Sequence, residues 1–74
     1  MILVKKNYIA GDNEIFVESD VPKKALLTYN NEYAVVEYSG YDSEQQAYLL
    51  DLQTSFSFDI NANMRIAMYK TASG

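Results

Sequence analysis

Four carboxylates occupy even-numbered positions between residues 12 and 20, with a phenylalanine at the centre of the run. The members of this acidic stripe are Asp12, Glu14, Phe16, Glu18 and Asp20. Alternate side chains of an extended strand share a face, so the stripe would line one side while Ile15 and Val17 face the other. Carboxylates spaced about 6.6 Å apart along a strand repel one another unless they meet cations. One interpretation is an edge or outer face whose charges prevent aggregation. The other is electrostatic binding of a cationic surface, with Phe16 as an apolar anchor.

Catalysis is not expected from this residue set. The chain has no histidine and no cysteine, which excludes the usual nucleophile–base pairs and Cys/His metal sites. Asp51 and Asp59 could serve as a paired acid and base, but a domain of 74 residues has little room for a deep cleft. Counted from Asp12, Val17 and Lys23 stand where a calcium-binding EF-hand loop needs glycine and glutamate. We therefore expect no catalytic residue, no metal and no cofactor.

The overall charge constrains the class of partner. Six basic residues stand against ten acidic ones, which gives a net charge of −4 at pH 7. Proteins that bind nucleic acid normally concentrate positive charge, so nucleic acid is not the expected partner. Residues 2–4 are apolar, but two lysines follow them at once, far short of a membrane-spanning run. We expect a soluble, cytoplasmic protein without membrane contact.

A tight hairpin around Gly11 is predicted to position the acidic stripe. Residues 11–12 suit the centre of a type II′ turn, which places glycine first. The opposed pairs of this register are Ala10 with Asn13, Tyr8 with Ile15, Lys5 with Glu18, Val4 with Ser19 and Ile2 with Val21. One face of the hairpin would then be apolar and the other charged, as a half-buried strand pair requires.

A second hairpin is predicted at Asn30 and Asn31, which can supply the two positive φ angles of a type I′ turn. The opposed pairs are Leu27 with Ala34, Leu26 with Val35, Ala25 with Val36 and Lys24 with Glu37. Both faces of this pair are largely apolar, so we expect it at the centre of a sheet. Pro22 belongs between the hairpins because it cannot donate to a ladder.

The stretch after the second hairpin is compatible with two structures. Residues 39–46 are polar and predict a loop, and residues 47–52 are typical of a buried strand. Ser43 with Gln46 three residues later also forms a capping-box pattern, so a helix at about 43–53 is the alternative. We favour the strand.

The remaining chain predicts two more strands. Residues 54–60 and 64–69 alternate apolar and polar side chains, with a turn at 61–63, and the tail 71–74 should fray. Residues 1–74 thus predict one all-β domain, a small antiparallel barrel or rolled sheet of about six or seven short strands. With the helix at 43–53 the class would be α+β.

The seven tyrosines are a second candidate contact feature. Tyrosine is enriched at interfaces because it buries a large area and keeps a polar tip, although it also favours strands. Tyr41 lies in the predicted polar loop beside Asp42 and Glu44. We add these three residues to the acidic stripe as candidate partner-binding residues.

These patterns predict a small acidic binding protein that inhibits or regulates a partner protein by docking on its basic surface. One form of this role is nucleic-acid mimicry, in which carboxylates occupy a phosphate-binding site; small phage or mobile-element proteins would suit it. The first alternative is a homo-oligomeric structural subunit that associates through strand edges or the face of Met64, Ile66 and Met68. The second is a small barrel that stacks single-stranded nucleic acid on its tyrosines.

Overall fold

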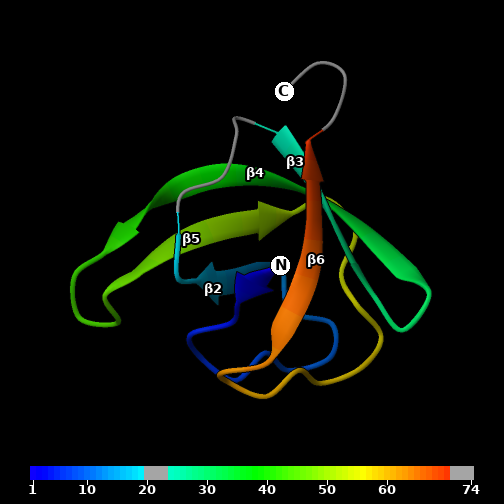
Figure 1. Ribbon diagram of the computed structural model, residues 1–74, viewed down its shortest axis with the longest axis horizontal. Coiled ribbons are helices and arrows are strands. Elements are labelled where there is room, and N and C mark those ends of the chain that lie inside the picture. The colour runs from blue at the N-terminus through cyan, green and yellow to red at the C-terminus, as the bar shows by residue number, and fades with distance from the viewer. Residues whose placement is uncertain (20–23, 71–74) are drawn as a thin grey trace.

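Six antiparallel strands form the framework of the described part of the chain, residues 1–19 and 24–70 of a computed structural model, and no helix occurs in that part (Figure 1). The strands are β1 (Ile2–Leu3), β2 (Glu14–Val17), β3 (Lys24–Tyr29), β4 (Glu32–Asp42), β5 (Ala47–Leu52) and β6 (Arg65–Lys70). They form one sheet in the order β1-β6-β3-β4-β5-β2. The predicted all-β class is confirmed. The stripe residue Asp20 and the tail 71–74 lie outside the described residues.

The helix alternative at 43–53 is wrong, and the favoured strand is confirmed as β5. β5 pairs with β4 on one side and with β2 on the other, so its backbone groups are satisfied by two ladders. Gln46 has a φ of 50°, a left-handed value that ends any helical run started at Ser43. The predicted loop at 39–46 is shorter than expected, because β4 continues to Asp42 and the turn occupies residues 43–46.

The sheet rolls until its two outer strands approach each other. Val4 and Val17 form an isolated antiparallel bridge between the chain after β1 and the end of β2. Beside it, the Lys5 N–H donates to the Phe16 carbonyl (2.8 Å) and the Glu18 N–H donates to the Leu3 carbonyl (2.9 Å). The contact is a short bridge rather than a full ladder, so the architecture is a rolled sheet with its edges held together.

The second hairpin forms as predicted. Asn30 and Asn31 have φ angles of 48° and 65°, the left-handed values of a type I′ turn. The register of β3 with β4 matches the predicted pairs, including Leu27 opposite Ala34. β3 lies between β6 and β4, which agrees with the central position predicted from its two apolar faces.

The first hairpin differs from the prediction in both its turn and its register. The Asp12 N–H donates to the Ile9 carbonyl (2.9 Å), so Ala10 and Gly11 form the turn centre, with Gly11 at φ 89°. Val4 therefore lies opposite Val17 instead of Ser19. The shift is two residues, which leaves every side chain on its predicted face; a hydrophobic pattern with a period of two therefore could not reveal it.

The chain before the turn pairs with the C-terminal half instead. β1 pairs with β6, and Tyr8 forms a bridge with Ile60 rather than with Ile15. In Figure 1 the loops around residues 5–13 (blue) and 53–64 (yellow to orange) gather at the same end of the molecule.

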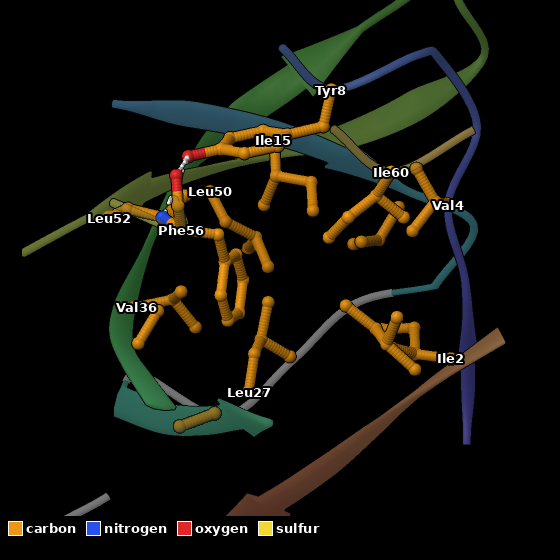
Figure 2. Packing of buried hydrophobic residues seen from close by; sticks show 14 residues of the cluster. Ile2, Val4, Tyr8, Ile15, Leu27, Val36, Leu50, Leu52, Phe56 and Ile60 are labelled. Carbon is orange, nitrogen blue, oxygen red and sulfur yellow. Dashed lines mark hydrogen bonds between the residues drawn. The ribbon is translucent and has the colours of Figure 1, made fainter. Parts of the chain in front are cut away.

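Apolar side chains from all six strands and from the loops fill the interior of the roll. Figure 2 labels ten of them: Ile2, Val4, Tyr8, Ile15, Leu27, Val36, Leu50, Leu52, Phe56 and Ile60. The rings of Tyr8 and Phe56 meet edge to face with centroids 6.0 Å apart. Ile66 is buried in the same core and Met68 packs against it, so their face of β6, one of the two surfaces named for the structural-subunit alternative, is not available for self-association.

The segment 54–60 is not the predicted strand. Within this segment only Ile60 forms a β-bridge. Phe56 and Ile60 are nevertheless buried, and Phe58 packs against the core. The alternating apolar side chains thus enter the core although the segment forms no strand. The backbone of this segment bonds to loops and side chains instead: the Gly11 N–H donates to the Phe56 carbonyl (2.9 Å), and the Phe56 N–H donates to the Tyr8 hydroxyl (2.9 Å).

The Tyr8 hydroxyl fastens the two loops together, as the dashed line in Figure 2 shows. It accepts from the Phe56 N–H and donates to the Asp12 carbonyl (2.6 Å).

We expect Tyr8→Phe to lower the free energy of unfolding at pH 7 by about 1–3 kcal/mol, because the buried Phe56 N–H loses its acceptor. Urea denaturation measures this loss. Tyr33→Phe is the matched control, since the Tyr33 side chain is 64% exposed; equal losses in the two variants would contradict the assignment.

The same hydroxyl predicts how stability changes with alkaline pH. Burial raises the pKa of Tyr8 above its ordinary value of about 10; the Phe56 N–H offsets part of this rise, and the carboxylates of Asp12 and Glu32 add to it. The fold therefore favours the protonated form, and its contribution is complete below pH 10 and lost as the pH rises through the folded pKa. The stability gap between the wild type and Tyr8→Phe should narrow above pH 10. A constant gap between pH 7 and 11 would count against a buried, protonated Tyr8.

A second tie joins the start of β4 to the 54–60 segment. The Glu32 carboxylate accepts hydrogen bonds from the Ser57 hydroxyl and from the Ser57 N–H (3.0 Å). These bonds, the hydroxyl first, lower the pKa of Glu32 below its ordinary value of about 4.5. The stabilising contribution is present above the ordinary pKa and is lost as the pH falls through the lowered one.

We expect Ser57→Ala to raise the pKa of Glu32 toward its ordinary value, because the first of its hydrogen-bond donors is removed. Carboxyl ¹³C chemical shifts followed by NMR between pH 2 and 7 would measure the midpoint, with Ser39→Ala in the exposed part of β4 as the control. Identical Glu32 midpoints in the wild type and Ser57→Ala would contradict the tie.

Candidate functional site

A half-open groove of about 450 Å³ runs beside β2 and contains much of the acidic stripe. Its charged and aromatic lining residues are Lys6, Tyr8, Asp12, Glu14, Phe16 and Asp51. Three carboxylates thus stand against one ammonium group in the groove. The lining comes from residues 12–16, from Asp51 of the neighbouring strand β5 and from the segment 6–8.

Carboxylates lie side by side on three adjacent strands, two of them in the groove and the third beyond it. Glu14 of β2 is directly opposite Asp51 of β5, and Asp51 is directly opposite Glu37 of β4. Directly opposed residues share a face of the sheet with their Cβ atoms about 4.5–5.5 Å apart. We call Glu14, Asp51 and Glu37 the carboxylate row; at a strand spacing of about 4.8 Å it spans roughly 10 Å.

Among the described residues, a cation lies at one end of the carboxylate row. The Lys24 Nζ lies 3.9 Å from an Oε of Glu37, next to it in the register. Within residues 1–19 and 24–70, no lysine or arginine lies within salt-bridge distance of Glu14 or Asp51. Like charges directly opposite each other on a sheet are destabilising. The row therefore costs stability that a cation placed between Glu14 and Asp51 would recover.

Phe16 provides an aromatic surface beside the carboxylate row. It is half-buried, lies opposite Leu49 of β5 and follows Glu14 on the same face of β2. The Lys6 Nζ lies 5.2 Å from the centre of the Phe16 ring, a cation–π distance. Lys6 thus occupies with its own ammonium group the position over the ring that an external cation would take.

The structure brings three residues of the predicted stripe together and separates a fourth from them. Asp12, Glu14 and Phe16 line the groove. Glu18 lies outside it, with an Oε 3.9 Å from an Nη of Arg65 and 3.3 Å from the Leu3 N–H.

The predicted partner of Glu18 is wrong. We expected Lys5 opposite Glu18, but the shifted register places Lys5 next to Phe16 in the backbone bridge and leaves Glu18 to Arg65. Glu18 is therefore engaged within the fold.

Tyr41, Asp42 and Glu44 lie at the far end of the β4–β5 hairpin and are not part of the groove. A bulge between Tyr38 and Gly40 shifts the register of β4, so that Tyr41 lies opposite Tyr48 with ring centroids 5.0 Å apart. Tyr41 remains 55% exposed. A carboxylate oxygen of Asp42 accepts from the N–H groups of Glu44 (2.9 Å) and Gln45 (3.2 Å), so it stabilises the turn. A contact role for these residues stays a prediction.

Sequence reasoning missed Lys6, Glu37 and Asp51 as members of the site. The second hairpin predicts Lys24 opposite Glu37 on one side. Asp51, its neighbour on the other side, follows only from the pairing of β4 with β5, which no local pattern indicates. Asp51 was considered only as an acid paired with Asp59. Asp59 is elsewhere, where an Oδ accepts from the Ala10 N–H (2.8 Å).

The groove offers charge and an aromatic face but no arrangement for metal chemistry. Within the described ranges, no group of three or more acidic side chains is placed to hold a metal ion. The basic side chains needed for a nucleic-acid surface are spread over the molecule: Lys24 pairs with Glu37, Arg65 with Glu18, and Lys6 covers Phe16. No helix in the described part is long and apolar enough to cross a membrane.

Comparisons of the chain with protein-family models, with curated proteins and with solved structures gave no match. The geometry and charge of the groove are therefore the basis of the functional argument.

Proposed function

We propose that the protein is a small non-enzymatic binding protein that docks the acidic groove onto a basic surface of a partner protein and thereby inhibits or regulates it. The observation that carries the proposal is the carboxylate row, in which Glu14, Asp51 and Glu37 lie directly opposite one another on neighbouring strands. Binding sites often retain groups that lower stability because the partner, not the fold, satisfies them.

The geometry suits a lysine or arginine side chain of the partner. Its cationic head would lie between Glu14 and Asp51, where it relieves their repulsion, and its aliphatic stem would lie against Phe16. Arginine fits better than lysine because its planar guanidinium can bond a carboxylate through two N–H groups and stack on a ring. The remaining acids around the groove would steer the encounter.

A phosphate-binding surface of a nucleic-acid-binding protein is one target of this chemistry. Such surfaces present arginine and lysine side chains to a row of anions, and the carboxylate row offers three anions over roughly 10 Å. Nucleic-acid mimicry is the form of inhibition that follows from this, and a phage or mobile-element source is in keeping with it.

An NMR titration tests the proposal without knowledge of the partner. The ¹⁵N-labelled protein is titrated with the capped peptide Gly-Arg-Gly-Arg-Gly and with the same peptide in which uncharged citrulline replaces arginine. We expect the arginine peptide to shift the amides of Glu14, Phe16 and Asp51 in a saturable and salt-sensitive way, and the citrulline peptide to leave them unchanged. Shifts of equal size at Tyr41 and Glu44, or no shift at the groove, would reject the assignment.

Removing the charge of Lys6 should strengthen binding at the groove. Because its ammonium group occupies the face of Phe16, it competes with the partner's cation. We expect Lys6→Gln to strengthen binding of the arginine peptide about three- to tenfold, since a competing charge and a cation–π contact of about 0.5–1 kcal/mol are removed. Lys70→Gln removes the same charge on β6, away from the groove, and is the control. Equal effects of the two variants would show that only net charge matters.

A further inference from the structure

Six uncharged side chains form a continuous patch on the outer face of the sheet, next to the Glu37 end of the carboxylate row. The cross-strand register defines this outer patch as two rows over β6, β3 and β4: Tyr69, Leu26 and Val35 in one row, and Ala67, Thr28 and Tyr33 in the other. Directly opposed residues share a face, and the alternating residues Ala25 and Leu27 are buried in the core. The outer patch therefore points to solvent.

The outer patch is unusual for a protein with a net charge of −4. Tyr33 is 64% exposed and Tyr69 is 57% exposed, while the side chains between them are partly buried. The nearest charged side chains on this face are Lys24 and Glu37, which lie two residues from Leu26 and Val35, and Arg65, two residues before Ala67. Lys24 pairs with Glu37, and Arg65 pairs with Glu18. An exposed apolar patch that carries tyrosines is typical of a protein contact surface.

Large and small side chains alternate at the corners of the outer patch. Tyr69 and Tyr33 occupy opposite corners of the two rows, and Ala67 and Val35 occupy the other two. We propose that the outer patch binds a second copy of this chain face to face, about a twofold axis that runs across the strands. This axis exchanges the two rows, so each Tyr69 ring lies over Ala67 of the second copy and each Tyr33 ring over its Val35. The surface is complementary to itself, as an isologous contact requires.

A second twofold axis, along the strands, would also place each tyrosine over a smaller side chain, but the charges at the margin of the outer patch favour the axis across the strands. A twofold axis along the strands would place Lys24 against Lys24 of the second copy, because the central strand β3 would face itself in register. The axis across the strands instead places Lys24 and Glu37 over Asn30 and Asn31 of the second copy, which are neutral. The strands of the two copies then cross at a small angle, one of the two arrangements that packed sheet faces adopt.

The size of the outer patch sets the strength of the contact. Two rows on three strands span roughly 10 Å by 7 Å between Cα atoms, so each copy would bury on the order of 400 Å², about half of what a stable dimer buries. The association is therefore a weak, concentration-dependent dimer. The groove residues Glu14, Phe16 and Asp51 stay outside the contact, whereas Glu37 lies at its margin, so the dimer would carry two grooves.

Sedimentation velocity between 10 µM and 1 mM tests the proposal. We expect dimer formation across this range, with the dissociation constant raised at least tenfold by Tyr69→Ala and by Tyr33→Ala. Tyr41→Ala is the matched control, because that tyrosine is 55% exposed but lies outside the outer patch. Added salt should strengthen the dimer by screening the net charges, whereas it weakens binding at the acidic groove, which separates the two surfaces.

A swap within β6 tests the axis itself. Ala67→Tyr alone would place ring against ring and weaken the dimer, and the double variant Ala67→Tyr/Tyr69→Ala would restore it by exchanging the two positions. A protein that stays monomeric at 1 mM overturns the proposal. So does a dimer that Tyr41→Ala disrupts as much as Tyr69→Ala, or one that the double variant fails to restore.

Discussion

Charge reversal at Asp51 should abolish binding to the basic partner and at the same time stabilise the fold. Asp51 lies between Glu14 and Glu37 in the carboxylate row, so Asp51→Lys turns two repulsive pairs into two attractive ones. We expect the free energy of unfolding to rise by roughly 0.5–1 kcal/mol, given that cross-strand charge pairs contribute roughly 0.2–1 kcal/mol each. The new ammonium group would also occupy the place of the partner's cation. Like charges juxtaposed at an interface cost several kcal/mol, so affinity should fall at least about 100-fold.

A rise in stability together with a fall in affinity distinguishes a binding site from a structural feature. Urea denaturation gives the stability, and the arginine-peptide titration gives the affinity. Glu44→Lys reverses an exposed charge in the turn of the β4–β5 hairpin and should change neither by more than a small amount. If Asp51→Lys binds the peptide as well as Glu44→Lys does, the carboxylate row is not the site.

The second large effect is expected at Phe56, the centre of the contact between the two loops. Its side chain is fully buried, meets the Tyr8 ring edge to face and stacks on Phe58 with centroids 5.4 Å apart. Phe56→Ala should cost about 3–5 kcal/mol through lost burial and the cavity left behind. At about 0.05–0.15 kcal/mol per residue a domain of 74 residues has roughly 4–11 kcal/mol in total, so much of the fold's stability would be lost.

Amide dispersion in NMR spectra and urea midpoints would measure the loss. Phe56→Leu keeps most of the buried volume and should cost clearly less. Thr54→Ala in the same segment, at an exposed position, should leave the midpoint nearly unchanged. A normal midpoint for Phe56→Ala would mean that the 54–60 segment does not close the core.

Local signals were enough for the second hairpin but not for the first. At Asn30 and Asn31 the turn residues and both apolar faces agree on one register. Around Gly11 the turn can be centred on residues 10–11, as observed, or on residues 11–12, as predicted. The two turns give registers that differ by two residues, and both place the same side chains inside. What decides between them is the pairing of β1 with β6 and of Tyr8 with Ile60, contacts between distant segments that no local pattern encodes.

The candidate site was predictable in the part that one strand supplies. Glu14 and Phe16 share a face of β2 by simple alternation, and both line the groove. Asp51 and Glu37 join them only because β5 lies between β4 and β2, and no turn signal in the sequence specifies the neighbour of β2. The segment 54–60 alternates apolar and polar side chains as a strand does, but its backbone bonds to loops. Its apolar side chains are therefore buried although it forms no strand ladder.

The most direct measurement of the central claim is a comparative capture from the native host. Immobilised wild type, Asp51→Lys and Glu44→Lys are exposed to the same extract at moderate salt, and the retained proteins are quantified by mass spectrometry. If an arginine-bearing partner supplies the cation that Glu14 and Asp51 lack among the described residues, a basic protein will be retained by the wild type and Glu44→Lys and lost from Asp51→Lys. Retention of the same protein in equal amounts by all three would contradict the account.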